Sequence, residues 1–204
     1  MTRVAVLGTG DVGRRLADGL ASVGHEVVLG SRTASEEART FADAAAWGEV
    51  VVNATGGIVS VDALTMAGAD NLAGKPLLDV SNALDHTVGF PPDVRATQSE
   101  SCAERIQAAF PQARVVKWLN TMNNRVMVQP DALPGPTTTF LAGDHADAKA
   151  VARRLLRDMG WADEDILDLG DLTASRALEL YLVLWLRMVV VLGDSNFNIH
   201  VVRA

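Results

Sequence analysis

The stretch RVAVLGTGDVG, residues 3–13, decides the fold class of this 204-residue chain. Its first half is a short apolar, β-branched run that predicts a buried strand, and apolar side chains at helical spacing follow as far as Gly24. The turn between them reads G-x-G-x-x-G, with glycines at Gly8, Gly10 and Gly13. In a strand–turn–helix unit these glycines allow a tight turn, close approach of the backbone to a pyrophosphate, and close packing of helix on strand. The stretch therefore predicts a dinucleotide-binding unit, and the alternative is a structural turn with chance glycines.

Strands and helices alternate along the whole chain. Predicted strands cover residues 3–8, 25–30, 49–55, 75–82, 113–120, 137–143 and 165–170. Predicted helices cover residues 11–23, 35–47, 61–69, 146–159 and 173–192, and a further helix begins at the capping-box pair Ser101 and Glu104. This order predicts an α/β fold of Rossmann type, with a doubly wound, mostly parallel sheet, helices on both faces and a short C-terminal helical extension. We expect one domain over residues 1–204, with a dinucleotide-binding core at 1–135 and a strand–helix extension at 136–204.

The segment 33–49 is short for such a fold. It has room for one helix, with Ser35 as its cap, but not for helix, strand and helix. The edge strand that is usually third in sequence is therefore expected to be missing. The strand at 49–55 would then lie on the far side of the first strand. A right-handed crossover would put helix 35–47 on the opposite face from helix 11–23.

Composition and charge narrow the class of protein. The chain is 49% apolar and 21% charged, as in soluble globular proteins, and its net charge of −7 argues against nucleic acid or an anionic membrane as partner. The single cysteine, Cys102, fits a reducing, cytoplasmic setting. The N-terminus lacks the features of a signal peptide. The most apolar segment, 178–193, contains Glu179 and Arg187 and predicts a buried helix rather than a membrane span.

The stretch VVLGSRT, residues 27–33, indicates which dinucleotide is bound. NAD sites usually carry an acidic residue at this strand end, but Gly30 lies here instead. Arg32 can pair with a 2′-phosphate through two parallel hydrogen bonds, and Ser31 and Thr33 can donate further ones. The pattern favours NADP over NAD. The alternative is that Arg32 is solvated and that Ser31–Thr33 only caps the next helix.

Five stretches together carry a family resemblance: GTGDVG, GHEVVLGSRT, KPLLDVSNALD, ARVVKWLNTMNNRVM and LGDLTASRALELYLVLWLRM. They resemble the NADP-dependent reductases of the deazaflavin coenzyme F420 and the cytoplasmic reductase domain of the STEAP metalloreductases. The likeness covers nearly the whole chain. It implies a Rossmann domain with a short C-terminal extension that binds NADP(H), passes hydride between the nicotinamide and a flat second ring, and forms dimers.

The resemblance also implies site residues, all at strand ends. Those implied for the pyrophosphate are Thr9, Gly10, Asp11 and Val12, and those for the 2′-phosphate are Ser31 and Arg32. Thr55 and Gly56 are implied beside the adenosine or pyrophosphate, Ser81 and Asn82 near the nicotinamide, and Asn120, Thr121 and Met122 beside the reacting rings. For Thr55, Ser81 and Asn120 the alternative is turn chemistry that closes a strand.

Hydride transfer between two rings needs no protein acid or base, and the sequence offers no Ser–His–Asp or Cys–His arrangement. We therefore expect no catalytic side chain and no metal site, since the four histidines lack ligand spacing. The leading hypothesis is an NADP(H)-dependent oxidoreductase acting on a deazaflavin, flavin-like or quinone-like acceptor. The alternatives are a non-catalytic NADP(H)-binding module that senses redox state or regulates a partner, and a reductase of small imines or carbonyls with Lys117 or Tyr181 as proton donor.

The last predicted helix has an apolar face that is too wide for one small core. This face includes Trp185, Leu186, Met188 and Leu192. It is interpreted as a homodimer interface or a lid over the second ring, and the alternative is an ordinary buried helix. The expected partners are thus a small-molecule substrate and a second copy of the chain.

Overall fold

One eight-stranded sheet organises the protein, which is described here by a computed structural model over residues 1–202. Its strand order is β10-β9-β8-β5-β4-β1-β2-β3. The strands are β1 (Arg3–Leu7), β2 (Glu26–Ser31), β3 (Ala38–Thr40), β4 (Val50–Asn53), β5 (Pro76–Asp79), β8 (Arg114–Trp118), β9 (Thr139–Ala142) and β10 (Ile166–Asp168). The central strands are buried apolar runs, as in sheets covered on both faces. All pairs are parallel except β8 with β9, so the predicted Rossmann-type sheet is confirmed.

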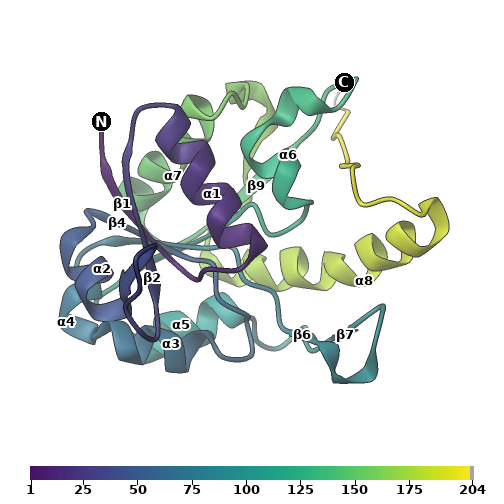
Figure 1. Cartoon of the computed structure of the whole chain (residues 1–204). Helices are drawn as coiled ribbons and strands as arrows, with labels where there is room; N and C mark the ends of the chain where they lie inside the picture. The colour runs from purple at the N-terminus through teal and green to yellow at the C-terminus, as the bar shows by residue number, and fades with distance from the viewer. Residues whose placement is uncertain (203–204) are drawn as a thin grey trace.

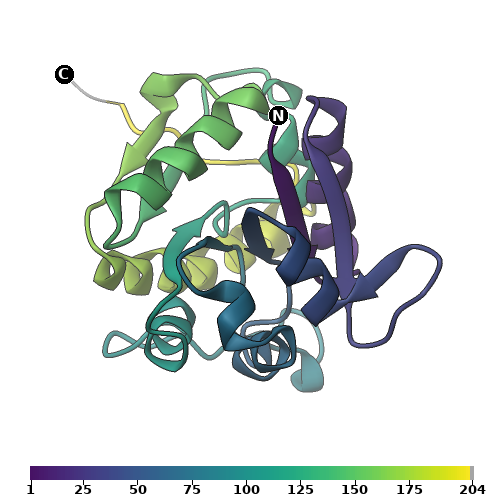
Figure 2. The same ribbon diagram turned by 90° about the vertical axis from the view of Figure 1, so that its left-hand side faces the viewer.

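Helices cover both faces of the sheet (Figures 1 and 2). One layer holds α1 (Asp11–Ser22), α6 (Asn124–Val128) and α7 (Ala146–Asp158). The other holds α2 (Phe41–Trp47), α3 (Ser60–Ala67), α4 (Ala69–Leu72) and α5 (Cys102–Ala109). Each layer has its own apolar core against the sheet, with Leu16 and Trp118 in the first and Phe41 and Ile106 in the second. The predicted opposite placement of α1 and α2 is therefore confirmed.

The C-terminal helix α8 (Ser175–Leu192) packs against α5. Gly193 ends it in the left-handed backbone conformation, which glycine commonly adopts at the ends of helices. Beside it, β6 (Leu84–Asp85) and β7 (Asp93–Val94) form a separate antiparallel pair (Figure 1). Single 3₁₀ turns complete the chain: η1 (His86–Val88), η2 (Pro130–Ala132), η3 (Asp163–Asp165) and η4 (Leu172–Ala174). Within residues 1–202, no helix has the length and apolar character needed to cross a membrane.

The prediction that the third strand is missing is wrong. β3 pairs with β2 in parallel, with Leu29 opposite Ala38 and Ser31 opposite Thr40. What the chain lacks is the helix between them, because residues 32–37 cross as a loop that protrudes from the molecule (Figure 2). Ser35 does not cap a helix; its hydroxyl accepts the N–H groups of Glu37 and Ala38 and turns the loop into β3. The cap of α2 is Thr40, whose Oγ1 accepts the N–H of Asp43 at 3.1 Å.

Candidate functional site

A cavity of about 750 Å³ lies where β1, β2 and β4 end. It brings together eight of the residues predicted to bind the cofactor: Gly8, Thr9, Gly10, Ser31, Arg32, Thr33, Thr55 and Gly56. Six further residues line it that were not predicted: Phe41, Ala54, Val59, Asp62, Ala63 and Met66. Three other predicted residues, Asp11, Val12 and Gly13, form the first turn of α1, which begins at this turn.

The three motif glycines differ in what surrounds them. A Cβ on Gly8 would lie 2.5 Å from the carbonyl oxygen of Ala54, and its backbone has a φ of +124°. A Cβ on Gly13 would lie 2.0 Å from the carbonyl oxygen of Gly8, so helix and turn touch there. At Gly10 an added Cβ would meet no atom within 4 Å. The first and third glycines therefore serve packing, and the second leaves open space in front of the helix.

That open space faces the N-terminus of α1. Gly10 is the residue that precedes this helix, and it has no side chain to accept the first N–H groups. Uncapped N–H groups at a helix start attract anions. The arrangement therefore fits a phosphate group of a dinucleotide.

Arg32 lies exposed at the rim of the same cavity. Among residues 1–202 it forms no ion pair, and its guanidinium is free to bind an anion. The preceding Ser31 donates its hydroxyl hydrogen to the carbonyl oxygen of Thr33, which bends the strand end around Arg32. A Cβ on Gly30 would lie 2.6 Å from Leu7 Cδ2 and 3.1 Å from Ala44 Cβ, so a larger side chain there would have to displace Leu7 of β1 and Ala44 of α2.

The residues predicted near the nicotinamide lie at the ends of β5 and β8. Asn82 donates to the carbonyl oxygen of Asn120 at 2.9 Å, and the Asn120 amide donates to Asn82 Oδ1 at 3.0 Å. Just before Asn120, Leu119 has a φ of +53°, a backbone conformation that non-glycine residues rarely adopt and that is common at ligand-binding sites. Ser81 is 3% exposed, and its hydroxyl has no partner among residues 1–202.

Two further residues predicted beside the rings, Thr121 and Met122, have buried side chains. Met122 is 5% exposed and packs into the core beneath α6, together with Val126. Thr121 is 2% exposed. The chain turns into α6 and carries this apolar side chain toward the core, and the position of Met122 beside a reacting ring stays a prediction.

A polar network lies directly under the site. Asn53, at the end of β4, donates to Ser60 Oγ at 2.9 Å and to Asp79 Oδ1 at 2.8 Å. Its own Oδ1 accepts the Thr55 hydroxyl at 2.7 Å. Thr55 thus stabilises the turn that follows β4 through its hydrogen bonds to Asn53, and it also lines the cavity.

Lys117 continues this network in the interior. Its Nζ lies 2.8 Å from Asp79 Oδ2 and 2.7 Å from Glu179 Oε1, and all three side chains are at most 1% exposed. Burial alone would lower the pKa of Lys117, but the two carboxylates outweigh it and hold that pKa above its ordinary value. A lysine so paired and enclosed does not fit the role of proton donor. Tyr181 is half-buried with a pKa raised by burial, and its hydroxyl has no partner within residues 1–202.

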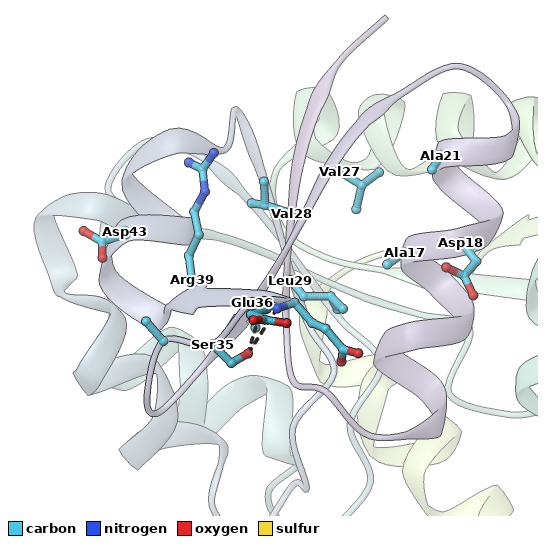
Figure 3. A pocket seen from close by; sticks show the side chains of 13 residues that line it. Ala17, Asp18, Ala21, Val27, Val28, Leu29, Ser35, Glu36, Arg39 and Asp43 are labelled. Carbon is cyan, nitrogen blue, oxygen red and sulfur yellow. Dashed lines mark hydrogen bonds between the residues drawn. The ribbon is translucent and has the colours of Figure 1, made fainter.

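A second hollow, of about 640 Å³, lies beside β2 where the crossover helix is absent (Figure 3). Val27 and Leu29 point from β2 toward α1, and Ser35 and Glu36 close the hollow from the loop. It gathers none of the predicted site residues. It is a consequence of the short crossover.

Comparison with known proteins agrees with this geometry. Residues 3–83 match the family model described as "NADP oxidoreductase coenzyme F420-dependent". A solved structure from Arthrobacter sp. FB24, provisionally described as an F420-dependent NADP-reductase, is 43% identical, covers 100% of both chains and superposes with a TM-score of 0.93. The chain belongs to the family of F420-dependent NADP oxidoreductases, whose members are NADP-dependent reductases.

Two further proteins resemble this family member, one in structure and one in sequence. A hypothetical protein from Sinorhizobium meliloti is 27% identical, with 86% of this chain and 88% of that chain covered and a TM-score of 0.70. Metalloreductase STEAP3 from Rattus norvegicus is 32% identical over 188 residues, which is 87% of this chain. The chain spans 36% of the length of that curated relative.

Sequence reasoning missed the buried polar residues behind the site, Asn53, Ser60, Asp79 and Glu179, and the cavity residue Asp62. A signal for two of them was present, since Asn53 and Asp79 each follow apolar residues within a predicted buried strand. A polar residue there needs a hydrogen-bonding partner. Glu179 gave no such signal, because one acid in a long apolar helix also fits a solvated face.

Proposed function

We propose that this family member transfers hydride between NADP(H), bound at the carboxyl ends of β1, β2 and β4, and a flat-ring acceptor of the deazaflavin, flavin or quinone class. One cavity combines an uncapped glycine turn with Arg32, which has no ion-pair partner in the described part of the chain, and this observation carries the proposal. The first suits the pyrophosphate, and the second suits a 2′-phosphate, which NAD lacks.

The residues present fit such a cofactor. Thr9, Gly10 and the first turn of α1 would hold the pyrophosphate, and Ser31, Arg32 and Thr33 the 2′-phosphate. Thr55 and Gly56 would flank the adenosine half, and Ser81, whose buried hydroxyl has no partner within residues 1–202, would face the nicotinamide half. When bound, NADPH supplies a hydride from its nicotinamide ring and becomes NADP⁺, while the acceptor ring is reduced.

The chain's own contribution is to bind and orient two rings and to exclude water. The paired amides of Asn82 and Asn120 would set the nicotinamide plane. An apolar cavity of about 730 Å³ between α8 and the β6–β7 connection, lined by Phe90, Pro91 and Trp185 among others, suits a flat aromatic acceptor. Asn123, three positions after Asn120, donates to Ser195 at the edge of this cavity at 2.7 Å, which supports its closeness to the proposed nicotinamide end.

The test compares Arg32→Ala with Arg39→Ala. Both remove one arginine charge from the same edge of the sheet, but Arg39 lies over the ring of Trp47 instead of lining the cavity. A charge-assisted hydrogen bond contributes about 1.5–3 kcal/mol, so Arg32→Ala should weaken NADPH binding roughly 10- to 150-fold and leave NADH binding unchanged. Arg39→Ala should bind both as the wild type does. Equal affinity of the wild type for NADPH and NADH would refute the 2′-phosphate assignment.

The acceptor is identified by mixing the NADPH complex with a deazaflavin, a flavin, a quinone and, because of the metalloreductase relative, a ferric chelate. Absorbance at the NADPH band reports turnover. Oxidation of NADPH by a ring acceptor supports the proposal. Absence of oxidation by every acceptor in the panel favours a non-catalytic NADP(H)-binding module.

We also propose that two copies associate through α8. Its outward side is apolar and open, with Val183 57%, Leu184 55%, Val191 75% and Leu192 60% exposed. Contiguous apolar surface of this kind is typical of subunit interfaces. Sedimentation should show a dimer for the wild type and a monomer for Leu184→Glu, and a monomeric wild type at tens of micromolar would refute it.

A further inference from the structure

Three charged side chains are enclosed together beneath the proposed cofactor site. Asp79, Lys117 and Glu179 are 0%, 0% and 1% exposed. Removing charges from water is costly, and buried ion pairs often contribute no more to stability than apolar residues of the same volume. Stability alone therefore gives a poor reason for keeping three ionised groups at this place.

The ammonium of Lys117 is fully used inside the protein. Its three hydrogens meet Asp79 Oδ2 at 2.8 Å, Glu179 Oε1 at 2.7 Å and the carbonyl oxygen of Ser81. It has no hydrogen left for a substrate. Its only available role is to fix what surrounds it.

Asp79 and Lys117 hold both ends of the Ser81 residue. Asp79 Oδ1 accepts the Ser81 N–H at 3.1 Å, and Lys117 donates to the Ser81 carbonyl oxygen. The next residue is Asn82, which forms the reciprocal amide pair with Asn120. The two charges thereby set the backbone that leads into the nicotinamide end of the site.

The same carboxylate of Asp79 reaches the other half of the site. Its Oδ1 also accepts from Asn53, and Asn53 accepts the hydroxyl of Thr55, which lines the 750 Å³ cavity. Asn53, Asp79 and Lys117 are register neighbours across β4, β5 and β8. One row of side chains across the sheet therefore links the loops at both halves of the site.

Glu179 joins this row to the C-terminal helix. Besides Lys117, it accepts the backbone N–H groups of Cys102 and Ala103 at the start of α5, at 2.8 and 3.3 Å. Those N–H groups offset the surplus negative charge of the trio. The residue before it, Leu178, accepts from the Asn120 amide at 3.1 Å. Helix α8 is thus tied to the strand ends at two consecutive residues.

We propose that Asp79, Lys117 and Glu179 are positioning residues for hydride transfer: they lock the Ser81–Asn82 backbone and α8 together, so that the nicotinamide ring is held in one orientation. This inference rests on the proposed NADP(H) function and deepens it. It assigns the trio to the nicotinamide half, whereas the adenosine half is held mainly by Arg32 and the glycine turn.

The test uses Glu179→Gln and Asp79→Asn, which keep size and shape but leave one acceptor oxygen where two are needed. The matched control is Arg176→Gln, which removes the other charged link between α8 and α5, the pair of Arg176 with Glu104, and touches none of the trio. Two ligands are titrated: NADPH, and adenosine 2′,5′-bisphosphate, which lacks the nicotinamide half.

We expect both trio variants to bind the bisphosphate within about twofold of the wild type. NADPH should bind about tenfold more weakly, with its nicotinamide fluorescence shifted toward that of free NADPH. The control, Arg176→Gln, should bind NADPH with the wild-type affinity and nicotinamide fluorescence, even if it unfolds at a lower concentration of denaturant. If the trio variants keep the wild-type nicotinamide signal, or if the control loses it equally, the proposal is overturned.

Backbone amide exchange in the ligand-free protein separates this proposal from the proposed function. Faster exchange around Ser81 and Asn82 in Glu179→Gln and Asp79→Asn, but not in Arg176→Gln, supports the positioning role. Unchanged exchange there overturns it. A wild type that binds neither NADPH nor the bisphosphate refutes the cofactor assignment, and the exchange result still decides whether the trio fixes this backbone.

Discussion

Replacing Gly10 by alanine should separate binding from folding. Gly10 has φ −77° and ψ −178°, which alanine adopts without strain, and its added Cβ would meet no atom within 4 Å. Alanine in place of glycine stiffens the unfolded chain, which stabilises by about 0.4–1 kcal/mol. At the position that precedes a helix, however, alanine makes the helix less stable than glycine does, by a similar amount of roughly 0.5–1 kcal/mol. The two effects nearly cancel, so the free energy of unfolding should change by less than about 0.5 kcal/mol.

Binding should respond much more strongly to the same methyl group. It would occupy the space in front of the α1 N-terminus where we place the pyrophosphate. Losing one hydrogen bond from a backbone N–H to a charged phosphate costs about 1.5–3 kcal/mol, which is roughly a 10- to 150-fold loss in NADPH affinity. Fluorescence titration measures the affinity, and urea unfolding measures the stability.

Gly135→Ala is the control, because its added Cβ also meets open space, in a loop outside the 750 Å³ cavity. It should leave NADPH affinity unchanged. If Gly10→Ala binds NADPH within twofold of the wild type while folding normally, the glycine turn is not the pyrophosphate site. A large loss of stability in Gly10→Ala would instead refute the conclusion that a Cβ at this position meets no other atom.

Two further outcomes are expected. Gly13→Ala should lower the urea midpoint by the equivalent of about 1–3 kcal/mol, because its Cβ would lie 2.0 Å from the Gly8 carbonyl oxygen and force α1 away from the turn; an unchanged midpoint would refute that packing. Burial, with the Glu179 carboxylate next, raises the pKa of Cys102 from 9.0 to about 11. The folded protein then holds this proton after the unfolded chain has lost it. The free energy of unfolding of the wild type should therefore fall by about 2 kcal/mol between pH 9 and 11 relative to Cys102→Ala, and parallel pH profiles of the two proteins would contradict this.

Much of the fold followed from local patterns in the sequence. The apolar runs located the strands, and the spacing of Ser101 and Glu104 located the start of α5, where both hydrogen bonds of the capping box are present. The third strand was missed because it has three residues and follows a loop instead of a helix. Residue count excludes a helical crossover between β2 and β3, but it does not exclude a crossover without a helix.

For the candidate site, the sequence located the strand ends but could not tell which way each side chain points. Gly8, Arg32 and Thr55 face the same cavity because parallel strands bring their carboxyl ends to one edge. Met122 also follows a strand, yet its side chain is turned into the core, where an apolar residue gains most. Direction depends on how the loop enters α6, which is a tertiary property.

The row formed by Asn53, Asp79 and Lys117 explains why the polar groups of the candidate site lie at one edge of the sheet. One residue earlier along each strand, the row is Val52, Leu78 and Val116, all apolar and fully buried. At the last row, Asn53, Asp79 and Lys117 replace this apolar pattern, and the strands end there or just beyond. Strand ends leave backbone groups without ladder partners, and these side chains satisfy them at Thr55 and Ser81. The loops that leave the sheet are thereby fixed by three side chains that do not themselves line the cavity. A single row thus holds the site rigid from below while its upper surface stays free for a ligand.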